Sequence, residues 1–138
     1  MILRMSPIIF AAVALTCFGQ ERFSSGELKG FVKSGTEHII VHVEEPFVVS
    51  AVAGVIASKT DSRPLANVIF EVRGPGNKET VRAAKTDHQG RFKIKRLLPG
   101  RYVFKATLDG FQSVVGMIVV SKTANQSTDI RIELPIGV

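Results

Sequence analysis

Apolar and polar residues alternate along much of the chain, which is the pattern of β-strands that bury one face. The alternation is clearest over residues 91–95, where Phe92 and Ile94 share one face and basic residues occupy the other. Residues 101–108 and 130–134 repeat the same period. Each of these three runs therefore predicts a strand with one side toward a core and one side toward water.

Further strands are predicted over residues 39–43, 47–58, 68–73, 80–85 and 111–121. The second and the last are apolar on both faces, which favours strands covered on both sides or, for the second, a bulge at Gly54. The polar composition of residues 80–85 is typical of an edge strand. Residues 39–43 are also expected at a sheet edge, and they end before Pro46, which cannot donate to a ladder.

The loops between these runs contain strong turn formers. Asp87 can accept hydrogen bonds from nearby backbone N–H groups, and Gly90 can adopt the positive φ that closes the turn. The pairs Pro99-Gly100 and Asp109-Gly110 predict the next two reversals.

No stretch shows a sustained helical period with caps. Strands at a spacing of about 10–12 residues indicate an all-β fold, a seven-stranded Greek-key β-sandwich. The predicted core consists of large apolar side chains on the inward faces: Val55, Val68, Phe70, Phe92, Ile94, Leu98, Tyr102, Phe104, Ile118, Ile130 and Ile132.

The N-terminus has the layout of a secretory signal peptide, with Arg4, a short apolar run over residues 8–15, and small residues ending at Gly19. The run is far shorter than the roughly 20 residues of a membrane-spanning helix. We therefore expect residues 1–19 to be removed on export, the alternative being an N-terminal strand or helix of the fold. Cys17, the only cysteine, would be lost with them. A lipid anchor on Cys17 is the second alternative, but the residues before it do not fit the lipoprotein pattern.

The 138 residues are enough for one domain. Residues 20–49 are rich in Ser, Gly and Lys at their start and predict a loose lead-in with an extra strand as an option, and residues 50–135 carry the sandwich. The formal net charge is +6, and basic residues gather on two strands that are expected to be neighbours. They form a candidate patch for an anionic ligand, with a solvated outer face as the alternative: Arg91, Lys93, Lys95, Arg96, Arg101 and Lys105.

Five motifs together resemble the carboxypeptidase regulatory-like domain, over about residues 50–134. They are Gly54-Val55-Ile56, residues 63–68, Thr86-Asp87 with Gly90, Phe92 and Ile94, Leu98-Pro99-Gly100 with Tyr102, and Gly110-Phe111. The resemblance implies a transthyretin-like or prealbumin-like β-sandwich, mostly without catalytic activity and attached to extracytoplasmic proteins. It also implies similarity to starch-binding-like sandwiches, some of which bind carbohydrate.

The residue inventory argues against an enzyme, because no carboxylate pair, nucleophile elbow or Cys–His set is present. His38 and His42 would lie about 13 Å apart on one strand, too far to share a metal ion, and His88 falls in a turn. No metal or other cofactor is therefore expected.

The sequence predicts a secreted or periplasmic module with a structural or protein-interaction role, whose partner is an envelope protein or polysaccharide rather than nucleic acid. An edge strand is the natural binding element of such a sandwich. Carbohydrate binding is the alternative function. It would depend on an exposed aromatic ring, and Phe47 and Phe111 are the candidates because the chain has no Trp.

Overall fold

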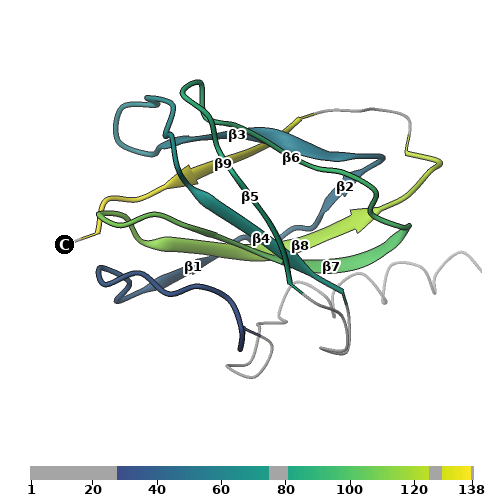
Figure 1. Ribbon diagram of the computed structural model, residues 1–138, viewed down its shortest axis with the longest axis horizontal. Coiled ribbons are helices and arrows are strands. Elements are labelled where there is room, and N and C mark those ends of the chain that lie inside the picture. The colour runs from purple at the N-terminus through teal and green to yellow at the C-terminus, as the bar shows by residue number, and fades with distance from the viewer. Residues whose placement is uncertain (1–27, 75–80, 125–128, 138) are drawn as a thin grey trace, which may run out of the picture.

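The computed structural model describes residues 28–74, 81–124 and 129–137, and within these ranges nine strands form two facing sheets (Figure 1). The predicted signal peptide and Cys17 lie outside the described residues. The strands are β1 (Ile40–His42), β2 (Phe47–Val49), β3 (Val52–Ser58), β4 (Ile69–Arg73), β5 (Arg82–Lys85), β6 (Arg91–Ile94), β7 (Gly100–Thr107), β8 (Ser113–Val120) and β9 (Ile130–Leu134).

The larger sheet, called sheet A here, has six strands in the order β1-β8-β7-β4-β5, and β2 also pairs with β8. The pairs β4–β5, β4–β7 and β7–β8 are antiparallel. Strands β1 and β2 run parallel to β8 and follow one another along its edge, β1 beside residues 113–115 and β2 beside residues 118–120. Residues from the predicted lead-in thus form one edge of this sheet.

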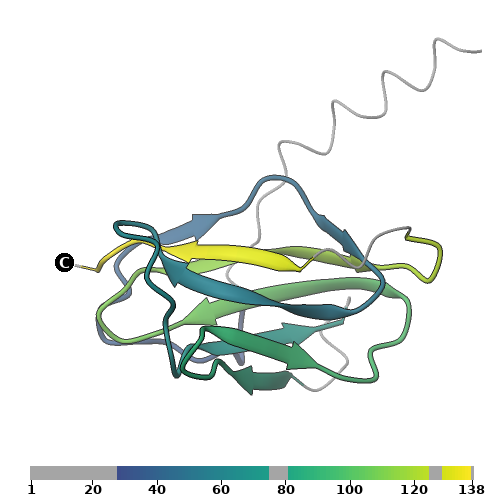
Figure 2. The ribbon, with the colours of Figure 1, turned by 90° about the horizontal axis from the view of Figure 1, so that it is seen from above.

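The smaller sheet, sheet B, has the order β6-β3-β9. Strand β3 pairs antiparallel with β6 and parallel with β9, which runs alongside it in Figure 2. Gly54 sits in the centre of this regular ladder, and a Cβ there would come within 2.0 Å of the Ile130 carbonyl oxygen. Glycine is required because β9 approaches closely, so the suggested bulge is not the reason for it.

The apolar run over residues 47–58 belongs to both sheets. Its first part is β2 in sheet A, and its second part is β3 in sheet B. This division gives nine strands in the described residues, against eight predicted runs, seven for the sandwich and the optional strand over residues 39–43. The all-β sandwich itself is confirmed.

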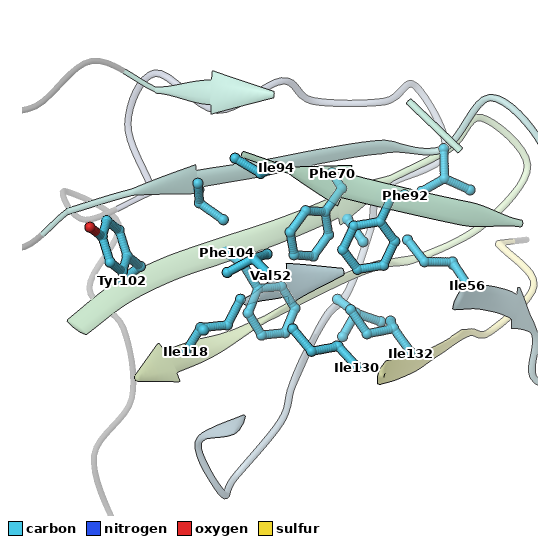
Figure 3. Packing of buried hydrophobic residues seen from close by; sticks show 14 of the residues in the cluster. Val52, Ile56, Phe70, Phe92, Ile94, Tyr102, Phe104, Ile118, Ile130 and Ile132 are labelled. Atoms are coloured by element: carbon cyan, nitrogen blue, oxygen red, sulfur yellow. The ribbon is translucent and has the colours of Figure 1, made fainter. Parts of the chain in front are cut away.

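Three phenylalanine rings fill the centre of the core between the sheets (Figure 3). Phe70 stacks on Phe92 of sheet B with ring centroids 4.1 Å apart, and on Phe104 of sheet A at 5.5 Å. Around them lie buried aliphatic side chains from both sheets: Val52, Ile56, Val68, Ile94, Ile118, Ile130 and Ile132. Burying each large apolar side chain contributes about 1.5–3 kcal/mol, which lets a chain of this size fold on its core.

Two residues of the predicted core are placed differently. Val55 points to the outer side of sheet B and is half-buried, because its neighbours Gly54 and Ile56 are the buried positions of β3. Leu98 lies in the turn before β7, and its side chain is 74% exposed. The Leu98 backbone, rather than its side chain, makes the contact with the core residue Tyr102: the Leu98 carbonyl accepts a 2.6 Å hydrogen bond from the Tyr102 hydroxyl.

The predicted turn between β5 and β6 is confirmed. Asp87 Oδ1 accepts hydrogen bonds from the backbone N–H groups of Gln89 and Arg91 at 2.9 and 3.0 Å. The hydrogen bond from the Arg91 N–H makes the largest contribution to lowering the pKa of Asp87. Gly90 has a φ of +75° and packs against the Ile56 carbonyl, where a side chain would not fit. This turn connects β5 of sheet A to β6 of sheet B.

Candidate interaction surfaces

Residues 28–39, called the strap here, cross the outer side of sheet A, the side that faces away from sheet B. In Figure 1 they are the dark blue segment before β1. Beneath the strap, outward residues of β4, β7 and β8 are buried although most of them are polar: Glu71, Arg73, Lys105, Thr107, Ser113 and Val115. The lead-in is therefore part of the packed structure from residue 28 onward.

The strongest contact of the strap is a buried ion pair. The Lys105 ammonium lies 2.8 Å from the Glu37 carboxylate, and the two side chains are only 2% and 3% exposed. The Ser113 hydroxyl donates a second bond of 2.6 Å to the same carboxylate oxygen. Burial pushes the pKa of Glu37 upward, but the bonds from Lys105 and Ser113 and the charge of Lys105 outweigh it, so the pKa lies below its ordinary value.

A second set of contacts fixes the start of the strap on β4. The Val32 N–H donates to both Glu71 carboxylate oxygens at 3.0 and 3.2 Å. The Arg73 guanidinium lies 4.8 Å from the centre of the Phe31 ring and donates to the Lys29 carbonyl. Burial raises the pKa of Glu71, and the Val32 hydrogen bond and the nearby cations only partly oppose that shift.

The predicted basic patch is divided by the fold. Arg91 and Lys93 point outward from β6 in sheet B, and Lys95 and Arg96 are exposed at its end. Arg101 is exposed on β7 in sheet A, so the two strands are not neighbours in one sheet. Lys105 was predicted at the surface, and that placement is wrong, because the strap covers it.

The structure adds a basic residue that the sequence pattern did not single out. Arg131 of β9 faces outward, and Val55 lies between it and Arg91 across sheet B. The same face also carries Glu133 and Asp129, whose carboxylate is 3.6 Å from the Arg91 guanidinium. Because charges of both signs alternate here, this face has the character of a solvated surface.

Strand β5 presents an open edge. It is the last strand of sheet A, and only β4 pairs with it among the described residues. The Thr86 N–H donates to the Val68 carbonyl, which points the backbone groups of Thr86 and Ala84 toward β4. Since this direction alternates along a strand, the N–H and C=O groups of Ala83 and Lys85 point away from β4, and both residues are exposed.

The Arg82 side chain fixes this open edge to the other sheet. Its guanidinium donates to the carbonyls of Lys95 and Arg96 in the turn after β6. Arg96 takes a left-handed φ of +63°, which brings its carbonyl into this position. The edge strand is thus held at the corner of the sandwich while its outer backbone groups stay accessible.

The residues considered for carbohydrate or metal lie elsewhere. Phe47 packs on Phe104 with ring centroids 5.9 Å apart, and Phe111 is half-buried against the core, so neither ring offers a free stacking face. His42 lies on β1, while His38 and His88 are exposed in loops. Within residues 28–74, 81–124 and 129–137, no group of three potential metal ligands comes together.

A protein-family model matches most of the sandwich. The model of the carboxypeptidase regulatory-like domain matches residues 51–135, which contain β3 to β9 but not the strap, β1 or β2. No protein of curated function is similar to the chain. In the described part of the chain, no helix has the length and apolar character that crossing a membrane requires. Because the family model matches more than half of the chain, the chain belongs to the carboxypeptidase regulatory-like domain family.

Proposed function

We propose that the protein is a non-catalytic interaction module of the cell envelope, and that it binds its partner by adding an extended partner segment to β5. In this mode the main-chain groups of an exposed edge supply the hydrogen bonds, and neighbouring side chains supply the specificity. Export is supported by the sequence of residues 1–19, which has the three parts of a signal peptide.

The observation that carries the proposal is the geometry of β5. The outward N–H and C=O groups of Ala83 and Lys85 are spaced as an incoming strand requires, and the small side chain of Ala83 leaves room beside them. Exposed edges are usually protected by bulges, prolines, covering segments, short length or charged side chains, and of these β5 has the short length and the charges of Arg82 and Lys85. Between Arg82 and Lys85 the strand carries neither a proline nor a bulge, so its edge remains able to pair.

The edge also disfavours pairing with itself. Two copies of β5 meeting at this edge would bring together two strands that each carry Arg82 and Lys85 and no acidic side chain, and this concentration of like charge disfavours the pair. A partner segment with acidic side chains would instead be attracted. The charge of the strand therefore favours a different protein over a second copy at this edge.

The test is site-specific photo-crosslinking in the envelope of an exporting host. A photoreactive amino acid at Lys85 is expected to give a discrete crosslinked product, and Ala83→Pro in the same protein is expected to abolish it, because proline removes the outward N–H. The matched control carries the same photoreactive group at Lys93, on the outer face of sheet B. A product that survives Ala83→Pro, or that forms equally from position 93, would contradict binding at β5.

Carbohydrate binding is not favoured by any observation on the described residues. Phe47 and Phe111, its two candidate aromatics, are packed against the core. We therefore keep the protein-interaction role as the proposed function.

A further inference from the structure

The strap leaves part of the outer side of sheet A uncovered, and apart from Arg101 the β2, β7 and β8 side chains there are apolar. Four aliphatic side chains point outward there, from β2, β7 and β8: Val48, Val103, Met117 and Val119. Val48 is 60% exposed, and the other three are partly exposed, as expected for side chains in the middle of an open sheet face. We call this group the open patch.

The strand register makes the open patch continuous. Val119 lies directly opposite Val48 on one side and Arg101 on the other. In the next row of the sheet, Met117 lies opposite Val103. An apolar cluster of this kind on a protein surface marks a contact site.

The charges that border the open patch are of opposite sign on its two sides. Arg101 lies on the β7 side, and its guanidinium is 3.7 Å from the Met117 sulfur. On the β2 side, Glu44 and Glu45 are exposed in the loop between β1 and β2. This loop runs beside the part of β8 around residue 117, since its flanking residues pair on either side of that point.

We propose that the open patch is a docking surface for a second copy of this chain. A two-fold axis parallel to the strands would place the β7 side of one copy over the β2 side of the other. Arg101 of each copy would then face Glu44 and Glu45 of its partner, around a shared apolar centre. A surface with one charge sign on all sides would repel a second copy, so the opposite signs make this face self-complementary.

The test is sedimentation equilibrium of the purified protein over a range of concentrations. An interface of this small size predicts a weak dimer, with a dissociation constant on the order of 10–100 µM. Val119→Arg places a charge in the apolar centre and is expected to weaken the dimer by at least about tenfold. The matched control, Lys93→Glu on sheet B, changes the charge of an exposed strand residue far from the patch and should leave the dimer unchanged.

Charge exchange distinguishes this face from any other. Arg101→Glu alone and Glu44→Arg with Glu45→Arg are each expected to weaken the dimer about tenfold, because each brings like charges together. Mixing the two variants should restore it, since both contacts of the mixed pair then join opposite charges. Arg101, Glu44 and Glu45 are exposed, and thermal unfolding will show whether the variants stay folded.

Three results would overturn the proposal: a protein that stays monomeric at about 1 mM, a dimer that Val119→Arg leaves intact, or variants that do not recover on mixing. The first would leave the patch to a partner of another kind. Ala83→Pro at the β5 edge should not alter the dimer, so this test and that of the proposed function fail independently.

Discussion

The two edges of sheet A are formed by different kinds of strand. Beside β8, the chain adds β1 and β2, and the strap that precedes β1 covers part of the outer face. At the β5 edge, the backbone groups of Ala83 and Lys85 point outward without a further strand beside them in the described part of the chain.

Both ends of the sheet are therefore edge strands, but β1 and β2 are only three residues each and are separated by a loop that contains Pro46, whereas β5 is continuous over four residues. The lead-in lies outside residues 51–135, which the family model matches, yet it forms the edge beside β8. Sheet edges that pair indiscriminately cause aggregation, so an interrupted edge at β1 and β2 and a short, charged edge at β5 both limit association.

Removing Glu37 should release the strap. In Glu37→Ala the buried Lys105 ammonium loses its nearest counter-charge, and we expect the free energy of unfolding in urea to fall by about 3–5 kcal/mol. The control is the double variant Glu37→Leu with Lys105→Met, which replaces both charges by apolar groups and should recover most of the loss. A loss below about 1 kcal/mol in the single variant would contradict a strap held by this pair.

Proline substitution should distinguish the two sides of β5. Ala84→Pro removes a hydrogen bond to β4 and is expected to cost about 2–3 kcal/mol of unfolding free energy, whereas Ala83→Pro removes an outward N–H and should cost less than about 1 kcal/mol. Urea denaturation of the two variants measures both values. Equal losses would mean that the outward direction assigned to Ala83 is wrong.

Removing the Arg82 guanidinium should loosen the open edge without unfolding it. Arg82→Ala loses two hydrogen bonds to the turn after β6, and we expect a decrease of about 1 kcal/mol in stability and faster amide exchange in β5. The comparison variant Arg82→Lys keeps the charge with fewer donors, so its exchange rates should fall between those of the other two proteins. Unchanged exchange in Arg82→Ala would contradict the role assigned to this side chain.

Two carboxylates at the strap contact, Glu37 of the strap and Glu71 of β4, should respond to pH in opposite directions, which is the smallest effect. The pKa of Glu37 is lowered in the folded protein, so its stabilisation is present above the ordinary value near 4.5 and is lost as pH falls through the folded pKa. The pKa of Glu71 is raised, so its stabilisation is present below about 4.5 and is lost as pH rises through the folded pKa.

Glu71→Gln should remove the second dependence. The unfolding free energy of this variant, relative to that of the wild type, is expected to increase as the pH rises from 4 to 7. Urea denaturation at several pH values measures it. A relative loss of stability over that interval would show that the buried Glu71 carboxylate is more favourable when charged than its surroundings indicate.

Much of the fold could be predicted because the exposed strands alternate cleanly. In β6, Phe92 and Ile94 face inward because Arg91 and Lys93 alternate with them and face water. In the turn before it, Asp87 and Gly90 are the residue types that the observed turn geometry favours. The edge positions of β1 and β5 were also predicted, since their polar or interrupted sequences do not fit the centre of a sheet.

The outer side of sheet A could not be predicted from local patterns. Lys105 alternates with Phe104 and Ala106 as a surface residue would, and only the strap, far away in sequence, makes it buried. The strap itself lacks an apolar period, because its contacts are hydrogen bonds and ion pairs rather than a hydrophobic face. The same limit applies to Val55, since a run that is apolar on both faces does not reveal which residues point inward.

Amide hydrogen exchange of the purified protein tests the difference between the two edges most directly. We expect fast exchange for Ala83 and Lys85 together with slow exchange for Ala84 and for Val43, whose N–H donates to the Val115 carbonyl at 2.8 Å. If Ala83 and Lys85 were as protected as Ala84 in the free protein, the β5 edge would already be covered and could not receive a partner strand.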